Sequence, residues 1–306
     1  GLLILMEEGH FSLNDPLAMH IPELANLKVQ DGLNADGSIR LRAAIRQPTM
    51  HDVLRHTTGW TGTVLDLFPD PVSQKLAKGE LKRPANLGQL ITALASEPLA
   101  YDPGTEWRYG PEHDLQGYLI EKFSGKKLAD FLRTRIFEPL GMIDTGFTLP
   151  PEKLGRFTVM YARKPDGSWA VFDPKAGSAY LADARDPRGG SGLTSTAADQ
   201  MRFGQMLLNG GELDGKRILG RKTVDMMLMD QLPASVRGVG FGPKFMKPGE
   251  RYGLGIGLYT DVAASGLIGS EGVAYWPGFS HTVMFIDRKE DMLVIAMSQH
   301  QPSDQS

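Results

Sequence analysis

The apolar residues of this chain follow a helical period in its first two thirds and a period of two near its end. In the first part, apolar side chains recur at spacings of three and four residues, which is the pattern of an amphipathic helix. Three segments show this pattern: 87–94, 115–123 and 128–136. Two Thr-x-x-Asp segments that resemble capping boxes, at 49–52 and 196–199, predict the starts of two further helices.

Strand patterns dominate the end of the chain. Residues 252–259 alternate leucine or isoleucine with glycine, which predicts a strand with one bare face. Residues 282–287 and 292–298 are apolar runs joined by four charged residues, the pattern of an antiparallel hairpin. Because helices precede strands without a regular β–α alternation, we expect an α+β fold. Its helical region should span about 45–210, and its sheet-forming part about 250–300.

The composition excludes several classes of protein. The chain has 306 residues and no cysteine, so disulfides, thiolate nucleophiles, Cys-bound zinc and iron–sulfur clusters are excluded. Its formal net charge of −3 lacks the basic balance of a nucleic-acid-binding protein, and no apolar run reaches the roughly 18 residues of a membrane span. None of the seven histidines forms an H-x-x-x-H or H-E-x-x-H pair. We therefore expect one domain over residues 1–306, with no metal, no cofactor and no nucleic-acid or membrane partner.

One segment, Ser124 to Lys127, matches the S-x-x-K pattern of serine hydrolases that use a lysine base. In such hydrolases the serine begins a buried helix, and the lysine one turn later takes its proton. Here Ser124 follows the amphipathic segment 115–123, and Gly125 suits the end of a helix. The sequence therefore predicts an exposed corner between two helices at this point, and not a nucleophile.

The chain opens with the pattern of the second half of a helix. Leu2, Leu5 and Met6 fall on one helical face, and Gly9 suits the position after a helix end. No N-cap residue and no first turn precede them. We therefore expect residues 1–9 to contain a helix whose first part is absent, and the domain to be truncated at its N-terminus.

Five segments resemble motifs of the serine β-lactamase-like superfamily, in the order of that family. They are Leu54–Gly59 (L-x-H-T-S-G), Pro103–Tyr109 with Asp114–Tyr118 (P-G-x-x-W-x-Y-S), Phe137–Met142 (P-L-G-M), Gly189–Asp199 (G-G-x-G-L-x-S-T-A-x-D), and Tyr275–Gly278 with Phe285–Asp287 (W-G-G and F-W-I-D-P). The chain is similar to class C β-lactamase-like esterases, the family VIII carboxylesterases. This resemblance implies a β-lactamase/transpeptidase-like fold, with an antiparallel sheet flanked by helices plus a helical region, and two-step acyl transfer through an acyl-enzyme.

The resemblance implies a catalytic role for Tyr109, which matches the tyrosine of the family's second motif. In the family this phenol exchanges a proton with the nucleophile, and a nearby lysine lowers its pKa from about 10. By analogy, that lysine and the serine nucleophile lie in an S-x-x-K motif about ten residues before Gly1. This chain alone is therefore expected to be inactive. The alternative for Tyr109 is a core aromatic residue with a bonded hydroxyl.

Trp276-Pro277-Gly278 stands where β-lactamases carry K-T-G on the strand that lines the site. The resemblance implies that the backbone N–H of Phe279 is an oxyanion donor and that Gly278 lets the substrate approach. Trp276 is either a wall of the acyl or alcohol pocket or a core residue. His281 is either a substrate contact or a polar filler.

Two departures from the β-lactamases favour neutral small-molecule esters as substrates. Pro111 replaces an asparagine two residues after Tyr109, and Trp276 replaces the lysine that meets a β-lactam carboxylate. We therefore expect a serine hydrolase of short-chain carboxylic esters. One alternative is an acyltransferase or a weak β-lactamase of the same fold, and another is a non-catalytic binding or assembly module. We also expect residues 56–59 to support a loop, and Asp114 to cap the following helix and to orient the Tyr109 loop. The sequence leaves open the oligomeric state and the choice between a cytoplasmic and a periplasmic location.

Overall fold

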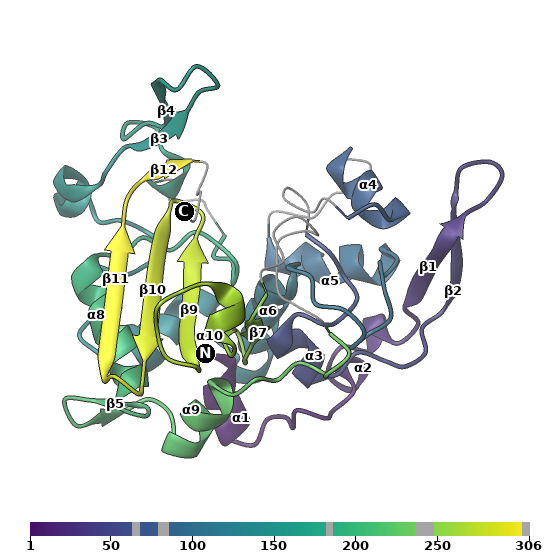
Figure 1. Cartoon of the computed structure of the whole chain (residues 1–306), viewed down its shortest axis with the longest axis horizontal. Coiled ribbons are helices and arrows are strands. Elements are labelled where there is room, and N and C mark those ends of the chain that lie inside the picture. Colours follow the sequence, from purple (N-terminus) through teal and green to yellow (C-terminus); the bar gives the residue numbers. More distant parts are fainter. Residues whose placement is uncertain (63–67, 79–85, 182–185, 237–247, 302–306) are drawn as a thin grey trace.

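A five-stranded antiparallel sheet with the strand order β11-β10-β9-β8-β7 forms one side of the molecule (Figure 1). The computed structural model describes residues 1–62, 68–78, 86–181, 186–236 and 248–301. The strands are β7 (Glu250–Tyr252), β8 (Gly257–Tyr259), β9 (Val273–Gly278), β10 (Thr282–Asp287) and β11 (Met292–Met297). The predicted hairpin is confirmed as β10–β11, in which Thr282 pairs with Met297 and Asp287 pairs with Met292.

The segment of alternating glycines is not the single strand that its pattern predicts. β7 ends at Tyr252 and β8 begins at Gly257, and these two residues pair across a hairpin. Between them the Gly253 N–H donates to the Ile256 carbonyl oxygen at 2.8 Å. Gly255 takes a φ of +80°, which side chains with a Cβ disfavour. The glycines therefore serve a tight turn, and they do not leave one face of a continuous strand bare.

Helix α8 (Ala197–Leu208) packs against β10 and β11. Gly204 makes this approach possible, because a Cβ there would lie 2.6 Å from a leucine methyl group of β11. As predicted, Thr196 caps the helix by accepting the Asp199 N–H at 3.2 Å. The Asp199 carboxylate does not complete a capping box, since it accepts the Asp144 N–H at 2.7 Å instead. This bond ties the start of α8 to the chain that follows the helical layer.

A layer of helices lies beside the sheet, with α6 at its centre (Figure 1). Its members are α3 (Met50–Arg55), α5 (Leu87–Ser96), α6 (Glu112–Ser124) and α7 (Leu128–Leu132), which continues as a π-helical turn (Arg133–Phe137). The three predicted amphipathic helices are confirmed as α5, α6 and α7 with its extension. The capping box of α3 is also confirmed: Thr49 accepts the Asp52 N–H, and the Asp52 carboxylate accepts the Thr49 N–H.

The core runs without a break from the helical layer into the sheet. Helix α1 (Leu2–Glu7) buries four apolar side chains and packs against α6. The same core cluster includes Leu115 and Leu119 of α6, Leu258 of β8 and Ile286 of β10. The helical layer and the sheet therefore share one hydrophobic core, and the candidate site described below lies at their junction.

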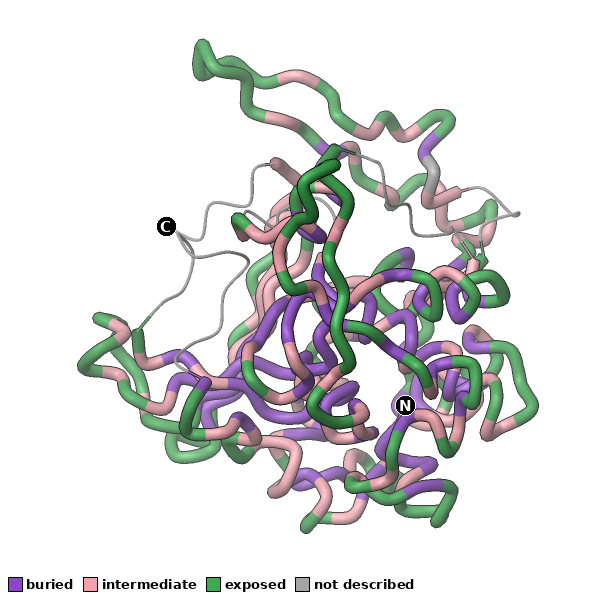
Figure 2. Tube along the Cα trace, turned by 90° about the vertical axis from the view of Figure 1, so that its right-hand side faces the viewer, coloured by how far each residue is buried: buried purple, intermediate pink, exposed green. Residues whose placement is uncertain are grey.

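Two hairpins extend from the body of the molecule (Figures 1 and 2). β1 (Lys28–Leu33) pairs with β2 (Ile39–Ala43), and β3 (Met160–Arg163) pairs with β4 (Trp169–Asp173). β12 (His300–Gln301) adds a third strand to the second hairpin. The remaining short elements are α2 (Leu17–His20), α4 (Pro71–Ala77), α9 (Arg221–Met227), α10 (Val262–Ser265), β5 (Glu212–Leu213), β6 (Lys216–Arg217) and 3₁₀ turns at Pro22–Leu24, Pro151–Arg156 and Ala179–Leu181. Among the helices that the structure describes, none has the length and apolar character needed to cross a bilayer.

Candidate active site

Tyr109 lies in the stretch that leads into α6, at the junction between the helical layer and the sheet. Its ring stacks on His56, with centroids 5.1 Å apart and planes inclined by 19°, and it meets Trp276 of β9 at 5.7 Å. Tyr252 of β7 closes this group, with its ring 5.5 Å from both His56 and Trp276. The structure therefore brings together Tyr109 and Trp276, which were predicted as site residues from separate motifs.

The loop after α3 holds the Tyr109 segment through backbone contacts. His56 follows α3 in the left-handed conformation, with φ +58°, and its carbonyl oxygen accepts the Arg108 N–H at 3.2 Å. A Cβ at Gly62 would lie 2.6 Å from the Tyr109 carbonyl oxygen, so a side chain there would push the two segments apart. These contacts support the predicted role of residues 56–59 in holding a neighbouring loop.

A buried polar network next to Tyr109 is the part of the site that sequence reasoning missed. Glu112, in the first turn of α6, is fully buried, and its Oε2 lies 2.9 Å from His56 Nδ1. Its Oε1 accepts the Thr58 hydroxyl at 2.5 Å. On the other side of the imidazole, His56 Nε2 lies 3.3 Å from His113 Nε2. The sequence signal for this network is slight: a glutamate and a histidine come soon after the Tyr109 motif.

The surroundings of Tyr109 keep its hydroxyl protonated near neutral pH. Burial raises the pKa of the Tyr109 phenol to about 12, and the negative charges of Asp114 and Glu112 add to this effect. Burial also holds the pKa of His113 well below its usual range, and the neighbouring His56 lowers it further. Only the phenolate form of Tyr109 can take a proton from a nucleophile. That form becomes available only if a nearby cation lowers the pKa of the phenol.

The end of β9 presents the predicted oxyanion segment. Gly278 pairs with Thr282 across the last rung of the β9–β10 ladder, and a Cβ on Gly278 would lie 2.2 Å from Thr282 Oγ1. A side chain at Gly278 would therefore force Thr282 to move, so the missing Cβ also serves the packing of this rung. Phe279 follows this rung, so its N–H is outside the ladder. The Phe279 side chain is 55% exposed and meets Phe172 of β4 at 6.3 Å.

The neighbours of His281 come from the residue that follows β11 and from β12. Its Nδ1 lies 2.6 Å from Ser298 Oγ, and its ring stacks on His300 with centroids 4.1 Å apart. The residue takes a φ of +59° in the turn between β9 and β10. These contacts group His281 with Ser298 and His300, whereas Trp276 is grouped with Tyr109.

Ser124 lies at the exposed corner that the sequence predicts. It is the last residue of α6, and its hydroxyl donates to the Ile120 carbonyl oxygen at 2.6 Å. Gly125 follows in the left-handed conformation, with φ +67°, and the Lys127 side chain is 80% exposed. The serine therefore does not begin a buried helix, and the lysine is not packed beside it as a base.

Asp114 does not cap α6, contrary to the prediction. Pro111 occupies the N-cap position, and α6 has no side-chain cap. Asp114 instead accepts the Gly190 N–H at 3.0 Å and pairs with Arg188. Because it already stands in the first helical turn, its carboxylate reaches outward to a neighbouring loop. It thereby fastens residues 188–190 to the start of α6, directly after the Tyr109 segment.

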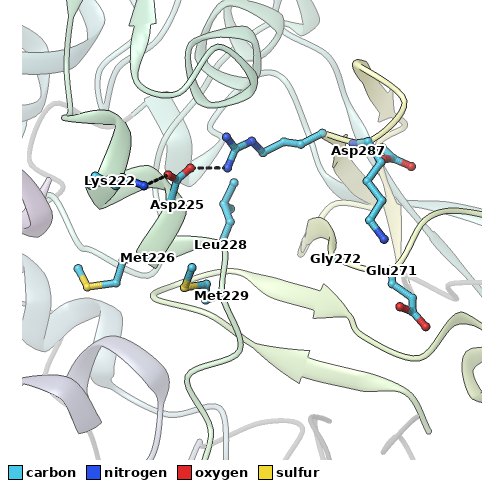
Figure 3. Close-up of a pocket in the computed structure, with 10 residues that line it drawn as sticks. Lys222, Asp225, Met226, Leu228, Met229, Glu271, Gly272 and Asp287 are labelled. Carbon is cyan, nitrogen blue, oxygen red and sulfur yellow. Dashed lines mark hydrogen bonds and ion pairs between the residues drawn. The ribbon is translucent and has the colours of Figure 1, made fainter.

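A cavity of about 390 Å³ lies between α9, the turn that precedes β9 and the turn that follows β10 (Figure 3). Charged side chains of both signs line it, and Asp225 pairs there with Arg288 at 2.9 Å and with Lys222 at 3.6 Å. None of the predicted site residues borders this cavity. Within the part of the chain that the structure describes, no three histidine, aspartate or glutamate side chains are grouped as metal ligands.

The chain is similar to proteins named as esterases and acyltransferases. The Beta-lactamase family profile matches residues 1–306. A lovastatin esterase of Penicillium rubens is 30% identical over 307 aligned residues, which cover 96% of this chain and 74% of the relative. The acyltransferase mokF of Monascus pilosus is 31% identical, over 75% of this chain and 53% of its own length. The solved structure of simvastatin synthase (LovD) from Aspergillus terreus has a TM-score of 0.80 at 25% identity, over 99% of this chain and 76% of that chain.

The antiparallel sheet and the helical layer define a protein of the β-lactamase/transpeptidase-like fold class, with the Tyr109–Trp276 contact at their junction. Within this class the chain belongs to the Beta-lactamase family. The predicted fold and the predicted membership of the β-lactamase-like superfamily are therefore confirmed. The relatives support a hydrolytic or acyl-transferring enzyme of this fold.

Proposed function

We propose that this protein is an esterase that hydrolyses neutral, short-chain carboxylic esters through a serine acyl-enzyme. The observation that carries the proposal is the contact between Tyr109 and Trp276, whose ring centroids lie 5.7 Å apart at the end of β9. Trp276 stands where the resemblance puts the lysine that meets the carboxylate of a β-lactam. An indole offers apolar contact in place of that positive charge, which suits an uncharged acyl or alcohol group. The similarity to a lovastatin esterase also supports hydrolysis.

In the proposed reaction, a serine hydroxyl attacks the ester carbonyl carbon and its proton passes to the phenolate oxygen of Tyr109, the form that a neighbouring lysine ammonium stabilises. The N–H of Phe279 donates to the oxyanion of the tetrahedral intermediate. Tyr109 then gives the proton to the leaving alcohol as the ester C–O bond breaks. In the second half, water attacks the acyl-serine, Tyr109 relays the water's proton to the serine oxygen, and the free acid leaves. A lysine ammonium near the phenol is needed because burial raises the pKa of Tyr109 to about 12.

The proposal takes the serine and the lysine from an S-x-x-K motif that precedes Gly1. The single S-x-x-K match among the 306 residues, Ser124 to Lys127, is excluded because Ser124 ends α6. We use the name "complete protein" for the chain together with that preceding segment. The isolated 306-residue chain then carries a proton relay and an oxyanion strand without a nucleophile.

Acyl transfer to an alcohol is the second candidate function. It is favoured by the similarity to a protein named as an acyltransferase, which aligns with 75% of this chain. The two functions share the acyl-enzyme and differ in whether water or an alcohol attacks it. A binding or assembly module without catalysis is the remaining alternative, and it predicts that no serine precedes Gly1 in an S-x-x-K motif.

The test compares substrates on the complete protein. We expect kcat/KM for a nitrophenyl butyrate to exceed that for benzylpenicillin by about ten- to a hundredfold, since the missing charge contact with the penicillin carboxylate costs about 1.5–3 kcal/mol. Comparable values for the two substrates would refute the preference for neutral esters. Adding propanol separates the two enzymatic functions, because an esterase releases butyric acid, whereas a transferase accumulates propyl butyrate. Absence of turnover with every ester would favour the binding module.

A further inference from the structure

The proposed acyl transfer leaves one buried group of side chains without a role. Glu112 and His56 are both 0% exposed, and a salt-bridge distance of 2.9 Å joins Glu112 Oε2 to His56 Nδ1. Thr58, also fully buried, donates to the second carboxylate oxygen of Glu112 at 2.5 Å. Burying a carboxylate is costly unless its oxygens are hydrogen-bonded, and here both of them are. These hydrogen bonds therefore offset part of the cost of taking the charge of Glu112 out of water.

The hydrogen bonds fix the orientation of the His56 ring. A carboxylate only accepts hydrogen bonds, so Nδ1 of His56 carries a proton and donates the hydrogen bond to Glu112 Oε2. The opposite nitrogen, Nε2, faces His113 Nε2 at 3.3 Å, and one of these two nitrogens donates to the other. Since both nitrogens of His56 are engaged, the imidazole cannot turn about its own axis without breaking a bond. The backbone of His56 is also held, because its carbonyl oxygen accepts the Arg108 N–H.

The fixed imidazole in turn holds the phenol of Tyr109. The two rings are nearly parallel, inclined by 19° with centroids 5.1 Å apart. His113, at the far end of the hydrogen-bond chain, meets Tyr109 at 5.8 Å and Trp276 at 6.3 Å, both edge to face. Among the described residues, His56, His113 and Trp276 therefore lie around the phenol. Glu112 is hydrogen-bonded to His56, whose opposite ring nitrogen faces His113.

We propose that Glu112 and His56 form a positioning pair for Tyr109, which sets the direction of the phenolic hydroxyl without contacting the substrate. This inference rests on the proposed function, because that function gives Tyr109 its proton-transfer role. It also extends the predicted role of residues 56–59 in loop support. The backbone of His56 holds the loop, and its side chain holds the Tyr109 ring. Proton transfer tolerates little misplacement, and an error of about 1 Å can cost about 10²-fold in rate.

The kinetic test uses the complete protein and two substitutions of Glu112. Glu112→Ala removes both acceptors, and we expect kcat for a nitrophenyl butyrate to fall by about ten- to a hundredfold while KM stays within about twofold. Glu112→Gln keeps an oxygen that accepts from His56 and an amide that donates to Thr58, so we expect kcat within about threefold of wild type. The matched control is Glu106→Ala. That carboxylate lies in the same segment but pairs with Arg108 at 2.8 Å, and its loss should leave kcat unchanged.

A spectroscopic test on the wild-type complete protein does not depend on the stability of the Glu112 variants. Imidazole ¹⁵N–¹H NMR should show a protonated Nδ1 on His56, with a slowly exchanging proton, assigned by comparison with His56→Gln. An unprotonated Nδ1 would overturn the inference, as would a folded Glu112→Ala protein with wild-type kcat. It would also fail if Glu112→Gln were as slow as Glu112→Ala, because the charge and not the hydrogen-bond geometry would then matter.

Failure of the proposed function gives a different pattern of results. If the complete protein cleaves no ester, or if Tyr109→Phe retains wild-type kcat, the role of Tyr109 is wrong and the positioning role fails with it. If Tyr109→Phe abolishes turnover while Glu112→Ala does not change it, the proposed function stands and only the positioning pair is rejected.

Discussion

Replacing Tyr109 with phenylalanine removes one oxygen atom and keeps both of its main ring contacts. The ring would still stack on His56 at 5.1 Å and meet Trp276 at 5.7 Å, so the packing energy is retained. Loss of a hydroxyl hydrogen bond costs about 1 kcal/mol of stability. Loss of a general acid–base group lowers kcat by about 10²–10⁴-fold, which corresponds to about 3–5 kcal/mol of activation free energy. The substitution therefore affects the reaction several times more than the fold.

The pKa of Tyr109 sets what its hydroxyl can do. With a pKa of about 12, the phenolate is only about 10⁻⁵ of the molecules at pH 7. Tyr109 therefore cannot act as a standing base in these surroundings, so the proposed reaction requires a lysine beside the phenol to assist the proton transfer. We expect Tyr109→Phe to lower kcat for a nitrophenyl butyrate by about 10²–10⁴-fold, measured together with the free energy of unfolding in urea.

Tyr118→Phe is the control, because this tyrosine lies on α6 and packs against the main core. It should be nearly silent in kcat. If Tyr109→Phe retains more than about half of the wild-type kcat while Tyr118→Phe does not, the wrong tyrosine has been assigned. The correspondence of residues 103–118 to the family motif would fail with it.

Three further predictions follow from the same structure. With a nitrophenyl butyrate as substrate, the isolated 306-residue chain should release nitrophenol only at the background rate. Turnover that survives Ser124→Ala but disappears with another serine substitution would reveal a nucleophile within the chain. Trp276→Lys in the complete protein should not create β-lactamase activity, since Pro111 also departs from the β-lactamase pattern; efficient hydrolysis of benzylpenicillin by this variant would contradict that. Asp52 is fully buried, and although burial opposes it, hydrogen bonds from Arg46 and Thr49 lower its pKa to about 2. Because the pKa of Asp52 is lower in the folded state, its charge stabilises the protein above about pH 4, and this effect is lost as the pH falls. The difference in unfolding free energy between wild type and Asp52→Asn should therefore narrow by about 2 kcal/mol between pH 5 and pH 2. A difference that does not change with pH would refute this prediction.

The helices and the last hairpin could be predicted because local periodicity decides them. Residues 87–94 carry an uninterrupted apolar stripe, and the capping box at Thr49 marks a helix start that the structure reproduces. The glycine-rich segment at 252–259 was wrongly predicted to be one continuous strand, whereas it forms the β7–β8 hairpin. A hairpin whose turn glycines fall on alternate positions has the same period of two as a strand, so the pattern does not distinguish them. The β1–β2 hairpin was not anticipated, since β1 contains the turn-like pair Asp31-Gly32 at a break in register.

The site could be predicted only where a family motif covers it. Tyr109 and Trp276 were selected by motif, and the fold places their rings in contact. The partnership of His56 with Glu112 could not be predicted, because nothing in the two segments shows that their side chains are buried together, and a glutamate near a helix N-terminus is ordinarily an exposed residue that favours the helix dipole. The burial of polar groups depends on how the layers pack together, and the local periodicity of the sequence does not predict it.

The charges around Tyr109 also bear on the choice of substrate. Besides burial, Asp114 and Glu112 both raise the pKa of the Tyr109 phenol, so these two carboxylates contribute a negative potential at its hydroxyl. A substrate carboxylate would meet this potential, and Trp276 offers it no compensating cation. A neutral ester carries no such penalty, and its carbonyl oxygen becomes negative only in the transition state, where the N–H of Phe279 is proposed to receive it. The same negative potential favours a lysine ammonium beside the phenol. The charges of Glu112 and Asp114 would therefore select against anionic substrates. They would also hold the cation that the proposed proton transfer requires.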